Sequence, residues 1–196
     1  MTAAVAPLGR DRPQPQPTDA SLVARSIRYP AAFADIFDRH WPDLQAYCTS
    51  RAGPAGEDIA AEVFRVAFDD RRRFDRRTAS ARPWLFGIAS NLLRSHFRGA
   101  ERGRRAFARS IPVDTTDPTD EALSRLEAQH LGPNLAAAIG DLPAKDREAL
   151  LLLAWTDLRY EDIAQALDIP IGTVRSRINR ARTRVRAHLT AQEDHA

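Results

Sequence analysis

The N-terminal half of the chain repeats apolar residues at the three- and four-residue spacing of amphipathic helices. The stretch over 30–48 places four apolar side chains along one face: Phe33, Ile36, Phe37 and Leu44. The sequence GPAG at 53–56 breaks this pattern. A second helix is predicted over 57–70, with Ile59, Val63, Val66 and Ala67 facing inward. After a basic loop, Pro83 suits the first turn of a third helix over about 84–98.

The same apolar spacing returns in the C-terminal third, from Leu135 onward. Between the two parts, residues 100–134 predict a linker with at most one short helix near 121–130, which Gly132 and Pro133 end. No segment shows the period-two alternation of a strand. The sequence therefore predicts an all-α protein with two small helical domains. The expected parts are a disordered Pro-rich N-terminus (1–20), a three-helix domain (21–99), a flexible linker (100–134), a four-helix domain (135–190) and a tail (191–196).

The last predicted helix carries its charge on one side only. On a wheel of about 100° per residue, one stripe is apolar: Ile171, Val174, Ile178, Ala181 and Val185. The opposite side holds Gly172, Ser176, Asn179, Arg180 and Thr183, with Arg175, Arg182 and Arg186 on one edge and Arg177 and Arg184 on the other. A solvated helix usually mixes glutamates among its arginines, and no acid occurs over 170–190. The pattern favours a helix that lies in the major groove of DNA, with edge arginines on phosphates and central residues on bases.

A short helix over 160–167, YEDIAQAL, precedes this arginine-rich helix. Its inward residues are Ile163, Ala164 and Leu167, and the small Ala164 lets the two helices approach closely. Asp168 tolerates the left-handed conformation that a tight turn needs. Together these elements predict a helix-turn-helix whose second helix reads DNA.

Charge is distributed in blocks along the chain. Residues 57–70 hold five acids against one base, residues 71–109 hold twelve arginines against two acids, and residues 110–146 hold seven acids against two bases. Residues 170–190 add six arginines. Two basic blocks separated by an acidic stretch indicate two polyanion-binding surfaces joined by a linker.

Composition excludes several other classes of protein. No apolar run approaches the roughly 20 residues that span a bilayer, and residues 1–17 lack the apolar core of a secretion signal. Cys48 is the only cysteine, which excludes an intramolecular disulfide and fits a reducing cytoplasm. The five histidines are scattered, without metal-site spacing. We expect a cytoplasmic protein without membrane insertion, metal or cofactor.

Residues 142–189 resemble the C-terminal promoter-reading domain of the extracytoplasmic-function (ECF) sigma factors of bacterial RNA polymerase. The segment IGTVRSRINRAR over 171–182 is the most specific part of the match. The resemblance implies recognition of the promoter −35 element by residues 172–186, chiefly Gly172, Thr173, Arg175, Ser176, Arg177, Asn179 and Arg180. The family often has glycine where Asp168 stands, so a slightly different turn is expected.

Two further motifs, EDIAAEVFRVAF (57–68) and RPWLFGIASNLLRSHFR (82–98), resemble the sigma N-terminal domain in the same order and spacing. On the second of these helices Asn91, Arg94 and Arg98 share a polar face that is suited to a DNA strand. The resemblance implies contacts at the −10 element through Arg82, Asn91, Arg94, Ser95 and Arg98. It also implies that a loop over about 71–82 captures a base flipped from the duplex, at a stacking cost of a few kcal/mol that the contacts must offset. Many members have an aspartate where this chain has Arg94-Ser95, so the preferred −10 sequence does not follow.

Asp58 and Glu62 lie one turn apart, and in the family this acidic helix docks on the clamp helices of core RNA polymerase. A solvated face is the alternative. Trp84 and Phe86 fit either stacking on a melted strand or core packing, whereas Trp41 and Trp155 are expected to pack. The linker acids Asp114, Asp117, Asp120 and Glu121 fit either a nucleic-acid mimic near the polymerase active-site channel or a solubility role. Implied partners are core RNA polymerase, including its flap region, promoter DNA and an anti-sigma factor.

These features predict a transcription initiation factor without enzymatic activity. One rival is a transcription activator with the same helix-turn-helix, which would need a ligand or phospho-acceptor domain, usually with strands, in the N-terminal half. The other is a DNA-cleaving enzyme that holds Mg²⁺ with Asp58, Glu62, Asp69 and Asp70. No nucleophile or histidine partner accompanies those carboxylates.

Overall fold

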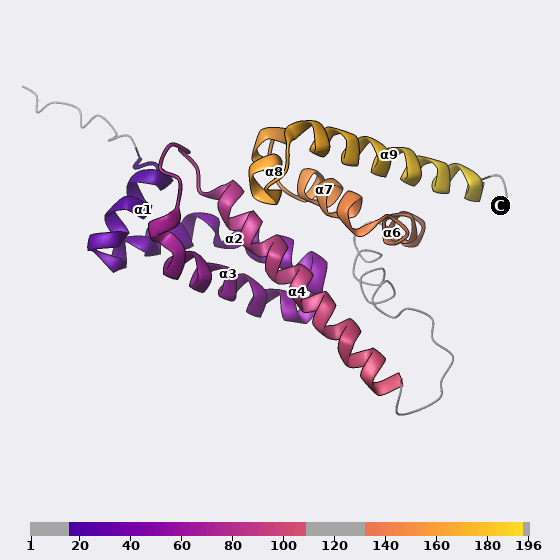
Figure 1. Ribbon diagram of the computed structural model, residues 1–196, viewed down its shortest axis with the longest axis horizontal. Helices are drawn as coiled ribbons and strands as arrows, with labels where there is room; N and C mark the ends of the chain where they lie inside the picture. Colours follow the sequence, from indigo (N-terminus) through magenta and orange to yellow (C-terminus); the bar gives the residue numbers. More distant parts are fainter. Residues whose placement is uncertain (1–15, 109–131, 194–196) are drawn as a thin grey trace, which may run out of the picture.

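The computed structural model describes residues 16–108 and 132–193, and every regular element in these ranges is a helix (Figure 1). The N-terminal unit comprises α1 (Asp19–Arg28), α2 (Ala34–Ala52), α3 (Gly56–Asp70) and α4 (Arg82–Ala108). Three short 3₁₀ turns join them: Pro30–Phe33, Gly53–Ala55 and Arg71–Arg73. The C-terminal unit comprises α6 (Pro133–Gly140), α7 (Ala144–Trp155), α8 (Tyr160–Leu167) and α9 (Ile171–Glu193). The all-α prediction is confirmed for the described residues.

The N-terminal unit differs from the expectation in two elements. Helix α1 was not predicted, so this unit has four α-helices rather than three. Its N-cap is Thr18, whose Oγ1 accepts the Ser21 N–H at 3.3 Å, and it buries Leu22 and Val23. Helix α4 runs to Ala108, ten residues beyond the expected end, because no proline interrupts its arginine-rich second half. The expected short helix over 121–130 and the acids of the linker lie outside the described residues.

Helices α2 and α3 form a tightly packed hairpin. At Gly56 an added Cβ would lie 2.3 Å from Cα of Thr49, so only glycine permits this approach. Ile36, Leu44 and Val63 are fully buried, as predicted. Phe37 is not: it is 37% exposed and stacks on Trp41 with ring centroids 4.9 Å apart.

The turn between α8 and α9 has the geometry that the sequence predicts. Asp168 adopts φ 51° and ψ 53°, the left-handed conformation, and its N–H caps the end of α8. The apolar stripe of α9 is confirmed, since Val174, Ile178 and Ala181 are buried against the rest of the unit. None of the helices in the described ranges is long and apolar enough to cross a membrane.

A buried carboxylate ties the N-terminal unit together. Asp19 on α1 lies 2.7 Å from His40 Nε2 and 2.5 Å from Arg39 Nη1, both on α2, and it accepts the Ala81 N–H at 2.8 Å. Burial alone would raise the pKa of Asp19. The hydrogen bonds from His40 and Ala81, with the positive charge on His40, outweigh burial and lower the pKa to about 2. Because Ala81 directly precedes α4, this carboxylate also fixes where α4 begins.

We expect Asp19→Asn to lower the free energy of unfolding by about 3 kcal/mol, because it removes the buried charge that His40, Arg39 and the Ala81 N–H surround. Urea unfolding at pH 7 measures the change. Asp35→Asn is the matched control, since the Arg25–Asp35 pair is half exposed on both sides and such pairs contribute at most about 1 kcal/mol. Equal effects of the two substitutions would contradict this assignment.

Stability should also depend on pH through Asp19. Its folded pKa of about 2 lies below the unfolded value of about 3.9. Its stabilising contribution is therefore fully present above the unfolded pKa and is lost as the pH falls through the folded pKa. Acid titration of unfolding should show a shallower loss of stability between about pH 4 and pH 2 in Asp19→Asn than in the wild-type chain.

Candidate nucleic-acid interface

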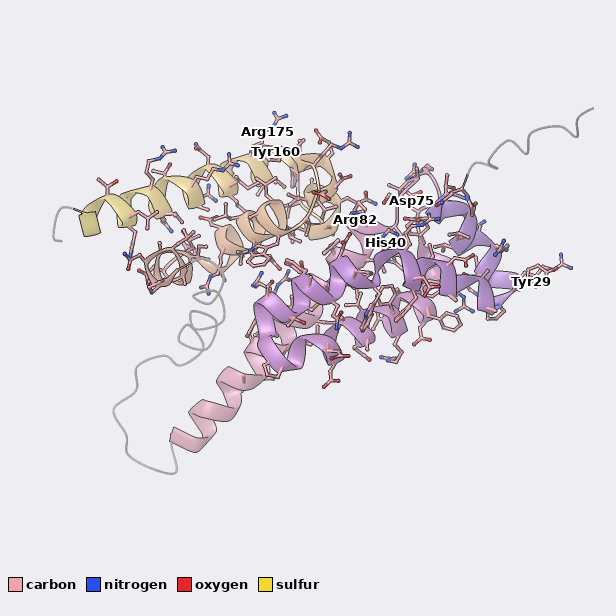
Figure 2. The ribbon with its side chains drawn as sticks, turned by 180° about the vertical axis from the view of Figure 1, so that it is seen from behind. Tyr29, His40, Asp75, Arg82, Tyr160 and Arg175 are labelled. Atoms are coloured by element: carbon pink, nitrogen blue, oxygen red, sulfur yellow. The ribbon has the colours of Figure 1, made fainter. Side chains whose placement is uncertain are left out.

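The outer face of α9 presents an open groove lined by polar and basic side chains. Its lining comprises Tyr160, Gly172, Arg175, Ser176, Ile178, Asn179 and Arg182. Figure 2 shows Arg175 and Tyr160 on the side of the C-terminal unit that faces away from the N-terminal unit. Since the apolar stripe of α9 is buried on the opposite side, this exposure follows from the helical repeat alone. The structure thus brings together four predicted −35 residues: Gly172, Arg175, Ser176 and Asn179.

The remaining predicted −35 residues are less accessible to a ligand, because they are partly buried or paired. Thr173 and Arg177 are partly buried, and the Thr173 carbonyl accepts the Ser176 hydroxyl at 3.0 Å. Arg180 is half exposed, but its guanidinium is paired with an acid of its own fold. Its Nε and Nη2 donate to the two Asp146 carboxylate oxygens at 3.2 and 2.9 Å, and these hydrogen bonds raise the pKa of the guanidinium.

Arg180 therefore has a structural contact in this structure, and its role in reading bases stays a prediction. Asp146 is buried in the first turn of α7 and needs a cationic partner. Sequence reasoning missed Asp146 and counted it only within the acidic block over 110–146. No local spacing relates it to Arg180, because the two residues are 34 positions apart.

On α4, the predicted −10 residues divide into exposed and paired side chains. Asn91, Ser95 and Arg98 are exposed. Arg94 donates to Glu148 Oε1 of α7 at 3.0 Å. Arg82 pairs with Asp43 of α2 and lies over the Phe86 ring, 5.6 Å from its centroid. Arg82 is therefore a link between α2 and α4 in this structure, whereas the other four residues are exposed, Arg94 with one ion pair.

The loop over 71–81 is anchored at one aromatic contact. Phe74 is buried against Trp84, with ring centroids 5.1 Å apart. Around it, the loop exposes Arg72, Arg73, Arg76 and Arg77. Arg77 donates to both Asp75 oxygens and to one of them from its backbone, which lowers the pKa of Asp75 to about 2. The loop is thus a folded basic element ahead of α4.

The aromatic residues near this loop pack within the fold. Phe86 is 2% exposed and meets Tyr47 edge-on at 5.3 Å, so it is a core residue. Trp84 is partly buried against Phe74. Trp41 and Trp155 pack against the core, as expected.

The acids of α3 form a chain of surface ion pairs. Arg65 donates to Glu62 at 2.5 and 2.7 Å and to Asp69 at 2.8 Å, while Asp58 is exposed. Within the described ranges, no group of three or more His, Cys, Asp or Glu side chains is placed to hold a metal ion. Of the four carboxylates of the Mg²⁺ alternative, Glu62 and Asp69 pair with Arg65, Asp70 pairs with Arg73, and Asp58 is exposed. Burial raises the pKa of the Cys48 thiol to about 12, so this cysteine is not a reactive thiol.

Two family models match the chain. The model described as Sigma-70 region 2 covers residues 36–103, and the model described as Sigma-70, region 4, covers residues 134–185. The first therefore spans most of α2 through α4, and the second spans the C-terminal unit as far as the middle of α9.

The chain is also similar to characterised proteins over most of its length. It is 32% identical over 173 residues to the ECF RNA polymerase sigma factor SigW of Bacillus subtilis, covering 81% of this chain and 89% of that protein. It is 32% identical to the ECF sigma factor EcfG of Rhodopseudomonas palustris, over 76% of this chain and 80% of the relative.

Two solved structures are also similar to the chain over most of its length. A structure of CnrH in complex with the cytosolic domain of CnrY matches with a TM-score of 0.63 and 25% identity over 88% of this chain and 97% of that one. The sigma factor RpoE of Bartonella quintana, in complex with the anti-sigma factor NepR, matches with a TM-score of 0.59 and 26% identity over 81% and 96%. Together with the exposed basic faces of α4 and α9, these matches show that the chain belongs to the ECF sigma factors, the transcription initiation factors that direct RNA polymerase to promoters.

Proposed function

We propose that α9 reads the promoter −35 element and that α4, with the loop before it, holds the −10 element. The observation that carries this proposal is the outer face of α9. Arg175, Ser176 and Asn179 are exposed there above a buried apolar stripe, and residues 170–190 contain no acid to neutralise them. A helix of this kind fits the major groove, where arginine contacts guanine and asparagine contacts adenine.

At the −10 element the exposed Asn91, Ser95 and Arg98 face the strand, and the basic loop supplies further cations. Single-stranded DNA is held by a combination of cationic and stacking contacts. In this proposal the loop arginines neutralise phosphates while the loop receives the flipped base.

Core RNA polymerase binds to Asp58 and Glu62 of the N-terminal unit. The flap region of the polymerase binds the C-terminal unit. Asp58 is exposed, and Glu62 is held only by a surface pair with Arg65, which a partner's cation can replace at little cost. Because the similar structure of the sigma factor RpoE is a complex with the anti-sigma factor NepR, we include an anti-sigma factor among the partners. The chain works in the cytoplasm, and the polymerase performs the chemistry.

Run-off transcription is the direct test. The purified full-length chain, mixed with core RNA polymerase and a library of promoter fragments, should yield transcripts with defined start sites that core enzyme alone does not produce. Failure to bind core enzyme, or binding without start-site selection, would overturn the proposed function.

Arg175→Ala should reduce discrimination at the −35 element by about 1–3 kcal/mol, the usual magnitude for a lost bidentate arginine–guanine contact. Binding to a selected promoter and to random duplex, compared at one salt concentration, measures it. Arg184→Ala on the same helix is the control. We expect it to weaken binding to both duplexes equally, since Arg184 is not part of the groove that Arg175 lines and an arginine beside the groove contacts phosphates. An equal loss for Arg175→Ala would show that it too contacts only phosphate.

Arg180→Ala should act through folding instead. It leaves the Asp146 carboxylate buried without its partner, so the melting temperature should fall by roughly 4 °C or more. Asp146→Asn should lower it similarly, whereas Arg175→Ala should leave it unchanged. If Arg180→Ala melts like the wild-type chain and loses −35 discrimination, Arg180 is a base-reading residue after all.

A further inference from the structure

Helix α1 lies along the basic loop that precedes α4, because it bonds to both ends of that loop. Arg71 at the start of the loop donates from its Nε to the Ser26 carbonyl of α1 at 3.4 Å. Ala81 at the end of the loop donates its N–H to Asp19 of α1 at 2.8 Å. The two α1 residues are about two helical turns apart. The loop therefore runs beside α1, and the C-terminal end of α1 lies at the start of the loop.

An exposed aromatic side chain stands at this end of α1. Tyr29 directly follows the helix and is 57% exposed. Pro30 comes next, which has no N–H to continue α1 and keeps Tyr29 extended, at φ −124° and ψ 87°. The backbone is fixed there, since the Tyr29 N–H donates to the Arg25 carbonyl and its carbonyl accepts the Ala32 N–H, both at 2.9 Å. Figure 2 shows Tyr29 projecting from the end of the N-terminal unit that lies away from the C-terminal unit.

Arginines gather at the same end of the unit. The Arg28 guanidinium carbon lies 5.6 Å from the centroid of the Tyr29 ring. The 3₁₀ turn Arg71–Arg73 contacts α1 and exposes Arg72 and Arg73. Within the part of the chain that the structure describes, Arg73 pairs with Asp70 at 3.4 Å, while Arg28 and Arg72 have no acidic partner. The Tyr29 ring is therefore accompanied by cations that remain open to an anionic ligand.

A ring among arginines, next to a basic loop, suits single-stranded DNA. A single strand is held where aromatic side chains stack on its bases while cations follow its backbone, and arginine adds a cation–π contribution. In a duplex the bases stack on one another and show only their edges in the grooves, so a lone surface ring gains little there. The loop continues the cations toward α4 through the exposed Arg76 and Arg77. The surface therefore fits a melted strand that runs from α4 over the loop to α1.

From this arrangement we propose that Tyr29 is a second stacking site for the melted DNA strand, with Arg28 and Arg72 on the strand's phosphates. The loop that receives the flipped base then has a strand contact on each side, one on α4 and one at the end of α1. The inference rests on the proposed assignment of α4 and the loop to the −10 strand. It adds a surface that precedes residues 36–103, the range that the Sigma-70 region 2 model matches.

The chain offers two matched pairs of substitutions at this end of α1. Tyr29→Ala removes the ring, whereas Tyr29→Phe keeps it. Because the ring is mostly exposed and the Tyr29 backbone bonds remain, both variants should melt at the wild-type temperature. Arg28→Gln removes an unpaired cation. Arg25→Gln, on the same helix, removes one that is already paired with Asp35 at 3.2 Å.

Binding is measured for the full chain without polymerase, with one arbitrary DNA sequence of about 16 nucleotides offered as a single strand and as a duplex. We expect Tyr29→Ala to weaken single-strand binding about tenfold, the usual effect of losing one stacked base, and Tyr29→Phe to keep it. Duplex affinity should be the same for these variants and the wild type. Arg28→Gln should reduce the slope of log affinity against log salt for the single strand by about 0.7, whereas Arg25→Gln should leave that slope unchanged.

Equal single-strand affinities of the wild type and Tyr29→Ala would overturn the inference, and so would an equal loss on the duplex. If Tyr29→Ala weakens the binding of core RNA polymerase and not of the strand, Tyr29 belongs to a protein interface and the inference also fails. Asn91→Ala separates the inference from the proposed function, since Asn91 is exposed on α4. A loss of strand binding with Asn91→Ala but not with Tyr29→Ala contradicts the inference alone. The reverse result supports Tyr29 and contradicts the assignment of α4.

Discussion

The structure depends on two buried carboxylates, one for each of the arginine-rich helices α4 and α9. Asp19 and Asp146 are the acidic side chains buried within the described residues. A carboxylate loses several kcal/mol of hydration on burial unless it is paired, so each must stay with its donors. The donors of Asp19 include the backbone just before α4, and those of Asp146 are on Arg180 of α9. The need to keep these charges paired therefore fixes α4 at its start and α9 near its middle.

Because the helices are fixed in this way, some arginines are paired within the fold and others are left exposed for a ligand. Arg180 is half exposed but is held by a buried acid of its own fold. Arg175 is exposed and lines the open groove of α9. The exposed cations of α9 therefore belong to a helix whose rotation is set by its interior contacts. Such preorganisation reduces the entropy lost on binding DNA.

Much of the fold followed from local sequence. The apolar stripe of α9 and the left-handed Asp168 could be predicted because each depends on spacing or on the residue itself. Helix α1 could not, since it follows a proline-rich stretch. The partners of Arg94 and Arg180 were missed for another reason. They lie 54 and 34 residues away in sequence, so they become visible only when tertiary packing brings α7 between the two arginine-bearing helices.

Both partners are on α7, two residues apart, and therefore on opposite sides of that helix. Their bonds differ in kind. Asp146 receives two hydrogen bonds from Arg180 inside one unit, whereas Glu148 receives one from Arg94 across the boundary between units. A bidentate pair with a buried acid is costly to break. A single hydrogen bond between Arg94 and Glu148 costs less to break, since it joins one pair of atoms rather than two. Helix α7 therefore supplies one paired carboxylate to the packing of α9 and another to the contact with α4, and the pair with α9 is the one that has two hydrogen bonds.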